Sequence, residues 1–107
     1  MTYLITYFNY EVQEGIMRLP LKLQARYIGL TERMIKYGPH LGLPHTESFG
    51  GGLFELRLKS PEGIARVFFC MKVGREIVML HSFIKKTQKT PEKELKIAKL
   101  RMKEIKK

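Results

Sequence analysis

The sequence predicts a single α+β domain spanning residues 1–107, with the element order β-α-α-β-β-β-α. Three observations predict this class. Apolar residues recur every three or four positions between residues 12 and 37, they alternate with polar residues between residues 52 and 73, and a lysine-rich segment with helical spacing follows. We therefore expect an antiparallel sheet packed on an N-terminal helical hairpin, with a basic helix at the C-terminus. A chain of this length suffices for one core and is too short for two.

The N-terminal part holds one predicted strand and the two helices of the hairpin. Thr2–Tyr7 is apolar and aromatic enough for a strand. Asn9 is the expected N-cap of the first helix, and Pro20 ends this helix or opens the next. The second helix should run from about Leu21 to Tyr37, where a Gly-Pro pair stops it. Both helices carry an apolar stripe at helical spacing, formed by Val12, Ile16 and Leu19 and then by Leu23, Tyr27, Leu30, Met34 and Tyr37.

The C-terminal part supplies the rest of the predicted sheet and the last helix. Residues 38–52 are rich in Gly, Pro and His and are expected to form a loop. Three strands should follow, over Gly52–Lys59, Ile64–Val73 and Glu76–Ile84. Thr90 then serves as the predicted N-cap and Pro91 as the first residue of a helix that continues to about Ile105.

The charge of the chain points to a polyanionic partner. Twenty Lys and Arg against ten acidic residues give a net charge of +10 and a pI near 9.9. Residues 85–107 alone hold ten basic residues and three Glu. A basic surface of this kind favours contact with nucleic acid.

Several classes of site are excluded by residues that the chain lacks. The single cysteine, Cys70, allows neither an internal disulfide nor a multi-cysteine zinc site, and there is no aspartate for a Ser-His-Asp triad or an EF-hand loop. With three scattered histidines, we expect no metal site and no cofactor. No apolar run is long enough for a membrane helix and no signal peptide is recognisable, so we expect a cytoplasmic protein with no membrane partner.

Two arginines are predicted to lie side by side on the sheet. Alternation places Arg57 and Arg66 on the face opposite the apolar residues, on adjacent strands joined by a short turn. Like charges at this distance repel unless an anion is present, which suits a phosphate site. The alternative is that Glu55 and Glu76 neutralise both arginines on a solvated face.

Three segments of the chain resemble one known family. They are GGGLFELR (50–57), GIARVFF (63–69) and LHSFIKKTQKTPEKELKIAKLRM (80–102), and the helical segment 19–46 fits the same pattern. Together they resemble the RelE/HigB toxin superfamily, in particular its phage-derived Gp49-like branch. The resemblance implies a RelE-like fold and metal-independent, ribosome-dependent cleavage of mRNA. It also implies three partners: mRNA, the ribosome with its rRNA, and a cognate antitoxin of the helix-turn-helix type.

The same resemblance implies the chemistry and the residues that perform it. The RNA 2′-hydroxyl attacks the adjacent phosphate, which leaves a 2′,3′-cyclic phosphate and a 5′-hydroxyl. The implied catalytic residues are Arg57, Arg66, Lys85, Lys86 and His81. We expect further RNA contacts from Lys59, Lys72, Lys89 and Lys93. The alternative for His81 is a histidine held by a hydrogen bond near the core. No aromatic residue follows Phe83 to stack on a base, as one does in some family members.

Two further hypotheses stay open at this point. The chain could be a non-enzymatic RNA- or DNA-binding module, whose basic sheet and helix serve affinity alone. It could also be an inactive phage-derived relative that acts through its protein partner. Toxicity of the protein expressed alone, relieved by replacing a single arginine, would separate an enzyme from both.

Overall fold

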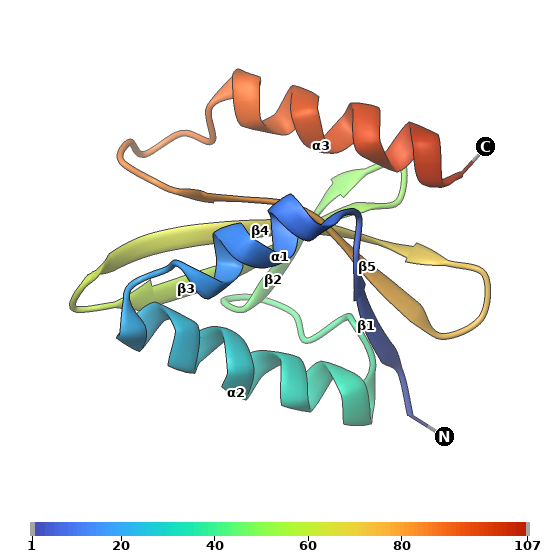
Figure 1. The fold of residues 1–107 in the computed structure, drawn as a ribbon, viewed down its shortest axis with the longest axis horizontal. Helices are drawn as coiled ribbons and strands as arrows, with labels where there is room; N and C mark the ends of the chain where they lie inside the picture. The colour runs from blue at the N-terminus through green and yellow to red at the C-terminus, as the bar shows by residue number, and fades with distance from the viewer. Residues whose placement is uncertain (1, 107) are drawn as a thin grey trace.

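The structure is a computed structural model that describes residues 2–106. The elements in chain order are β1 (Leu4–Tyr7), α1 (Tyr10–Met17), α2 (Leu21–Tyr37), β2 (Thr46–Gly50), β3 (Leu53–Ser60), β4 (Gly63–Lys72), β5 (Glu76–Ile84) and α3 (Glu92–Ile105). The α+β class, the helical hairpin and the final helix are therefore confirmed (Figure 1). None of the helices within residues 2–106 is long and apolar enough to cross a membrane.

The five strands form one sheet in the order β1-β5-β4-β3-β2. Its neighbours are antiparallel except for β1 and β5, which pair in parallel, so the sheet is not antiparallel throughout as the sequence suggested. The expectation of a loop over the whole of residues 38–52 was wrong, because β2 lies inside that segment. Thr46–Ser48 pairs with β3, and a register shift follows between Ser48 and Gly50.

The helical hairpin covers one face of the sheet. Asn9 is the N-cap of α1 as predicted, and its Oδ1 accepts a hydrogen bond from the Val12 N–H at 2.9 Å. The two helices run in roughly opposite directions (Figure 1), and α1 contacts β5 while α2 contacts β3. Their apolar stripes pack on the side chains that alternation assigned to the apolar face, except that Tyr37, expected on the stripe of α2, is exposed at the end of the helix. The sheet contributes Leu56, Leu58, Ala65, Val67, Phe69, Ile77 and Met79 to this core.

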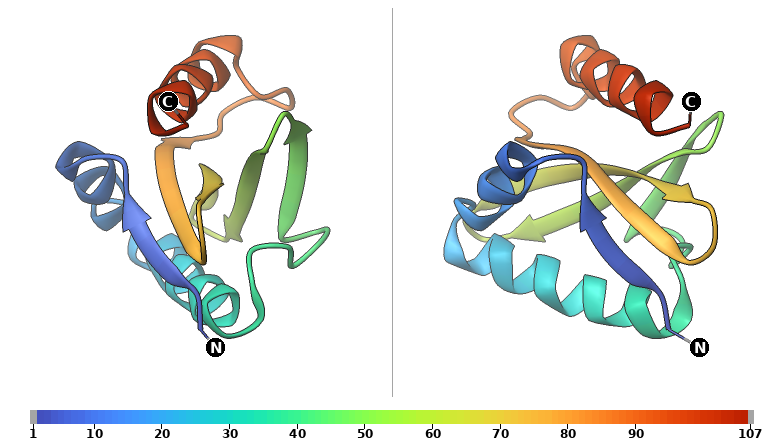
Figure 2. Two further views of the ribbon diagram at one scale, coloured as in Figure 1. Left: turned by 90° about the vertical axis from the view of Figure 1, so that its right-hand side faces the viewer. Right: turned by 45° about the vertical axis from the view of Figure 1, so that its right-hand side comes forward.

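The second face of the sheet is covered in part by α3, which lies across β4 and β5 (Figure 2). The face on which alternation placed Arg57 and Arg66 is therefore not an open surface, as the side-by-side arginines would suggest, but is largely buried. Phe68 and Cys70 are fully buried there, packed with Ala98 and its neighbours on α3. The side chains of β3, β4 and β5 alternate between two cores rather than between a core and solvent, which is why successive residues along β4 are apolar.

The start of α3 also differs from the prediction. The helix begins at Glu92, its N-cap is Pro91, and no side chain caps it. Thr90 does not act as the N-cap. Its hydroxyl instead donates to Glu55 Oε2 on β3, at 3.4 Å. This hydrogen bond attaches the segment between β5 and α3 to β3.

Candidate functional site

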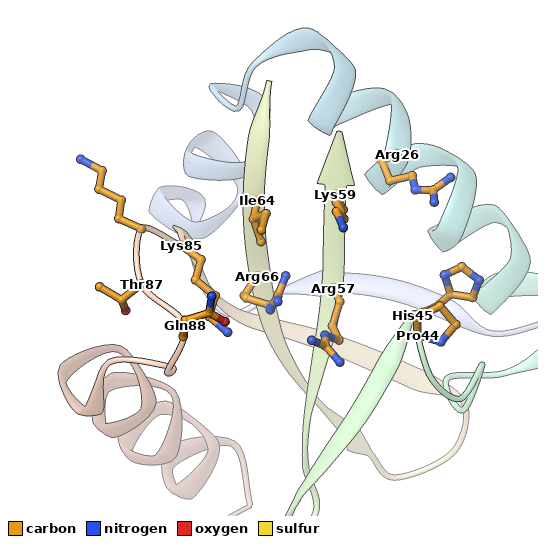
Figure 3. A pocket seen from close by; sticks show the side chains of 11 residues that line it. Arg26, Pro44, His45, Arg57, Lys59, Ile64, Arg66, Lys85, Thr87 and Gln88 are labelled. Atoms are coloured by element: carbon orange, nitrogen blue, oxygen red, sulfur yellow. The ribbon is translucent and has the colours of Figure 1, made fainter. Parts of the chain in front are cut away.

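A basic cavity of about 680 Å³ opens where α3 leaves the sheet uncovered. Figure 3 shows side chains from four parts of the chain around it: α2, the segment before β2, strands β3 and β4, and the segment after β5. The lining residues are Arg26, Pro44, His45, Arg57, Lys59, Ile64, Arg66, Lys85, Lys86, Thr87 and Gln88. Six of these eleven are Lys or Arg and none is acidic, so the cavity is suited to a polyanion.

Strand register explains why the cations lie together. Arg57 and Arg66 are direct partners in the β3–β4 ladder, and Lys59 is paired with Ile64 in the same ladder. The Lys85 N–H donates to the Ile64 carbonyl at 2.8 Å, which extends β5 alongside β4. Residues paired across strands project from the same face. Lys85 therefore lies beyond Arg66, on the side away from Arg57 (Figure 3).

A buried carboxylate lies next to these cations. Glu55 is 1% exposed. Its Oε1 is 3.3 Å from Arg66 Nε and 4.0 Å from Arg57 Nε. Arg66 is buried as well, and its Nη1 also donates to the Ala65 carbonyl at 3.2 Å. Of the two glutamates proposed to neutralise the arginines, Glu55 does so in a buried position. Glu76 instead accepts a hydrogen bond from the Thr6 hydroxyl at 2.8 Å.

Burial and charge shift the pKa values of three groups at the cavity. Burial raises the pKa of the Glu55 carboxyl, and the opposing effects of Arg66, Lys85 and Arg57 do not cancel it. Burial lowers the pKa of Arg66, against the attraction of Glu55. Burial, Arg66 and Arg57 lower the pKa of the Lys85 ammonium, while Glu55 acts in the other direction. A lowered pKa is what a lysine needs to act as a base near neutral pH.

Arg26 and His45 also line the cavity, although no pattern in the sequence predicts it. Arg26 projects from the exposed side of α2, and His45 precedes β2 in a segment expected to be irregular. The His45 carbonyl accepts the Arg57 N–H at 2.8 Å, which ties this segment to β3. Burial, Arg33 and Arg26 lower the pKa of the His45 imidazole. Arg26 and His45 are brought together by the tertiary fold, which no local sequence pattern encodes.

The residues implied as functional divide into two groups. Arg57, Arg66, Lys85, Lys86 and Lys59 line the cavity. His81, Lys72, Lys89 and Lys93 are not among its lining residues. The side chain of His81 is 16% exposed, and its Nε2 lies 2.6 Å from Glu94 Oε1 on α3, so it joins the sheet to the helix. Lys93 instead lines a separate groove on α3 beside Ile97 and Leu100.

No group of three or more His, Cys, Asp or Glu side chains within residues 2–106 is arranged to hold a metal ion.

Comparison with known proteins places the chain in a family. Residues 14–103 match the family described as phage derived protein Gp49-like (DUF891). A comparison with curated proteins finds no match. Among solved structures, the fold is similar to a chain from the crystal structure of the archaeal RelE–RelB complex of Pyrococcus horikoshii OT3. The TM-score is 0.57 at 19% identity, over 78% of this chain and 96% of that one. The protein, which has a RelE-like fold, therefore belongs to the phage-derived Gp49-like family.

Proposed function

We propose that this protein is the toxin of a toxin–antitoxin pair and acts as a metal-independent endoribonuclease that cuts mRNA on the ribosome and so inhibits translation. The observation that carries the proposal is the basic cavity, in which Arg57, Arg66 and Lys85 come together on one face of the sheet. Family membership and the RelE-like fold support the same assignment. A protein with this activity would work in the cytoplasm, where its substrate is translated.

The proposed reaction begins with loss of a proton from the RNA 2′-hydroxyl. The 2′-oxygen forms a bond to the adjacent phosphorus, and the bond from phosphorus to the 5′-oxygen breaks. The products are a 2′,3′-cyclic phosphate and a 5′-hydroxyl, which takes up a proton as it leaves. Arg57 and Arg66 are suited to stabilise the negative charge that accumulates on the phosphate oxygens in the transition state.

Proton transfer is assigned to the lysines and histidines near the cavity. Lys85 is the favoured base, because its surroundings lower its pKa. Lys86 and His45 line the same cavity and are the next candidates. His81 is a weaker candidate than Lys85, because its imidazole is bound to Glu94. Lys59, Lys72, Lys89 and Lys93 are proposed to contact the RNA backbone outside the reacting phosphate.

The proposed partners are mRNA, the ribosome and an antitoxin. The neighbouring structure is named as a complex of RelE with RelB. By analogy, we propose that a cognate antitoxin, of the helix-turn-helix type, binds this chain and suppresses its activity.

The test is a cell-free translation reaction in which new mRNA ends are mapped by primer extension. The wild-type protein should produce discrete in-frame cuts, and Arg66→Ala should abolish them. Arg75→Ala is the matched control, because it removes an exposed arginine from the turn at the other end of β4 and β5. Cuts by the control but not by Arg66→Ala would support the assignment. Intact mRNA with every variant, despite ribosome binding, would favour a non-enzymatic binding module.

His81→Asn extends the same assay to the histidine outside the cavity. If the cuts persist, the role of His81 is structural, through its contact with α3. If a folded variant no longer cuts, His81 takes part in proton transfer.

A further inference from the structure

Glu55 is a buried carboxylate to which the proposed reaction gives no role. It lies in the middle of β3 and does not line the cavity, so it cannot touch the substrate from this position. Removing a carboxylate from water is unfavourable unless ion pairs and hydrogen bonds offset the loss of hydration. Phe68, its partner in the β3–β4 ladder, shows that this face readily accommodates an apolar side chain. An acidic residue here therefore calls for an explanation beyond packing.

The two oxygens of Glu55 contact different walls of the cavity. Oε1 faces Arg66 and Arg57, which form the cationic floor. Oε2 accepts a hydrogen bond from Thr90, which belongs to the segment that follows Lys85 and Lys86. A single carboxylate thus connects the floor of the cavity to the segment that forms its opposite wall.

The contact with Arg66 fixes a group that has few other restraints. Arg66 Nε is buried and has no hydrogen-bond acceptor in suitable geometry among the described residues, so Glu55 holds it through charge at 3.3 Å. Arg57 lies directly across the ladder from Arg66. Two guanidinium groups on paired positions repel each other, and the carboxylate beside both of them reduces that repulsion.

We propose that Glu55 is a positioning residue, which holds Arg66 beside Arg57 and fastens the Lys85–Thr90 segment so that their cations converge on one phosphate. This inference rests on the proposed nuclease function. The carboxylate screens part of the positive charge of the cavity and therefore weakens its overall attraction for RNA. Glu55 would instead favour the reaction by keeping the cations in position, because a displacement of about 1 Å at a reacting centre can lower a rate about 100-fold.

Positioning and screening predict opposite effects when the charge is removed. Glu55→Gln keeps the size of the side chain and deletes its negative charge. If Glu55 only screens the cations, the variant should bind RNA more tightly and cut at least as fast. If Glu55 positions Arg66, kcat should fall about 100-fold while KM does not rise. The two readings are therefore separated by the sign of the change in kcat.

The pH dependence gives a second signature. Glu55 and Glu47 favour the protonated form of Lys85, whereas burial, Arg66 and Arg57 disfavour it. Glu55→Gln should therefore lower the pKa of Lys85 further. If Lys85 is the base, the rising limb of the pH–rate profile moves to lower pH, which a purely structural defect would not produce.

The experiment compares the full-length wild type with Glu55→Gln and Glu47→Gln on programmed ribosomes. Glu47 is exposed and is paired with Glu55 in the β2–β3 ladder, so Glu47→Gln removes one nearby charge without disturbing the buried contact. The control should keep kcat within about threefold of wild type. Nitrogen-15 NMR of the arginine Nε–H groups provides a readout that does not depend on activity. The Arg66 signal should be slow to exchange in wild type and in Glu47→Gln, and should exchange rapidly in Glu55→Gln.

Each outcome decides a separate question. An unchanged or higher kcat together with an unchanged Arg66 signal overturns the positioning role. If wild type leaves mRNA intact, the proposed nuclease function fails, and the NMR comparison alone decides whether Glu55 holds Arg66. If Glu55→Gln does not fold, Thr90→Val replaces it, since this variant breaks only the contact to the second wall. Thr90→Val should lower kcat and Thr90→Ser should restore it, and wild-type kcat in Thr90→Val would overturn the proposed attachment of that wall.

Discussion

Arg57 and Arg66 occupy directly paired positions on neighbouring antiparallel strands, yet only Arg66 is buried. The side chain of Arg57 is 34% exposed and that of Arg66 is 6% exposed. Both are paired with the same oxygen of Glu55, at 4.0 Å and 3.3 Å respectively. The two arginines therefore share a face and a counter-ion but differ in how much the fold depends on them.

This difference predicts unequal losses of stability. Arg66→Ala should lower the free energy of unfolding by about 3 kcal/mol, because it leaves the buried Glu55 carboxylate without its nearest partner. Arg57→Ala should lower it by less than about 1 kcal/mol, because its longer contact is partly exposed to solvent. Urea denaturation of both variants measures the difference. Equal losses would contradict the asymmetry in burial.

The salt dependence of RNA binding reports how many phosphates the cavity contacts. For single-stranded nucleic acid, the slope of log affinity against log salt is about −0.7 per phosphate neutralised. Arg57→Ala should therefore make the slope shallower by about 0.7, since Arg57 lines the cavity and is solvent-accessible. Fluorescence anisotropy with a labelled, uncleavable oligonucleotide provides the measurement. A slope unaffected by Arg57→Ala would place the main contacts elsewhere, and Arg75→Ala serves as the control.

His45 should titrate below the ordinary range of histidine. Burial lowers the pKa of its imidazole, and Arg33 and Arg26 lower it further because nearby cations oppose the gain of a proton. Replacing Arg33 by Ala removes one cation, so the pKa of His45 should rise. Proton NMR of the ring resonances follows this titration directly. Arg18→Ala, which removes an arginine paired with Glu14 on α1, should leave it unchanged.

The contact between His81 and Glu94 should control how firmly α3 lies on the sheet. Cys70 lies beneath this helix and is fully buried, so its reaction with a thiol reagent reports opening of that layer. Glu94→Ala should weaken the docking of α3 by about 1 kcal/mol and accelerate the reaction roughly fivefold. Glu92→Ala, at an exposed position in the first turn, is the control. A reaction equally fast in wild type would show that His81 and Glu94 do not hold the helix.

The parts of the fold that the sequence predicts are those with a strong periodic signal. Leu23, Tyr27, Leu30 and Met34 have the spacing of a helix that packs on one face, and α2 has the bounds expected from them. The strand β2 was missed because Thr46–Gly50 has neither alternation nor β-branched residues beyond Thr46. Its extended conformation comes from hydrogen bonds to β3, an effect that local composition does not record.

The sequence likewise predicts only those neighbours in the cavity that local geometry brings together. Alternation and turn length place Arg57 and Arg66 together, because both depend on local geometry. The burial of Arg66 could not be predicted, since it depends on how the chain packs around β3 and β4. Arg26 and His45 reach the cavity through the packing of α2 and the path of the chain before β2. No pattern within a few residues of either one encodes that approach.

The parallel pairing of β1 with β5 has a consequence for how the protein is made. Leu4 is paired with Glu76 and Tyr7 with Met79, so β1 is synthesised well before the strand with which it pairs. Pairing segments this far apart in the sequence closes a long loop, which slows folding. Lys85 and Lys86 come after β5 and are therefore synthesised later still. Until β5 and the segment after it have been translated, a nascent chain therefore has neither the partner of β1 nor a complete cationic cavity.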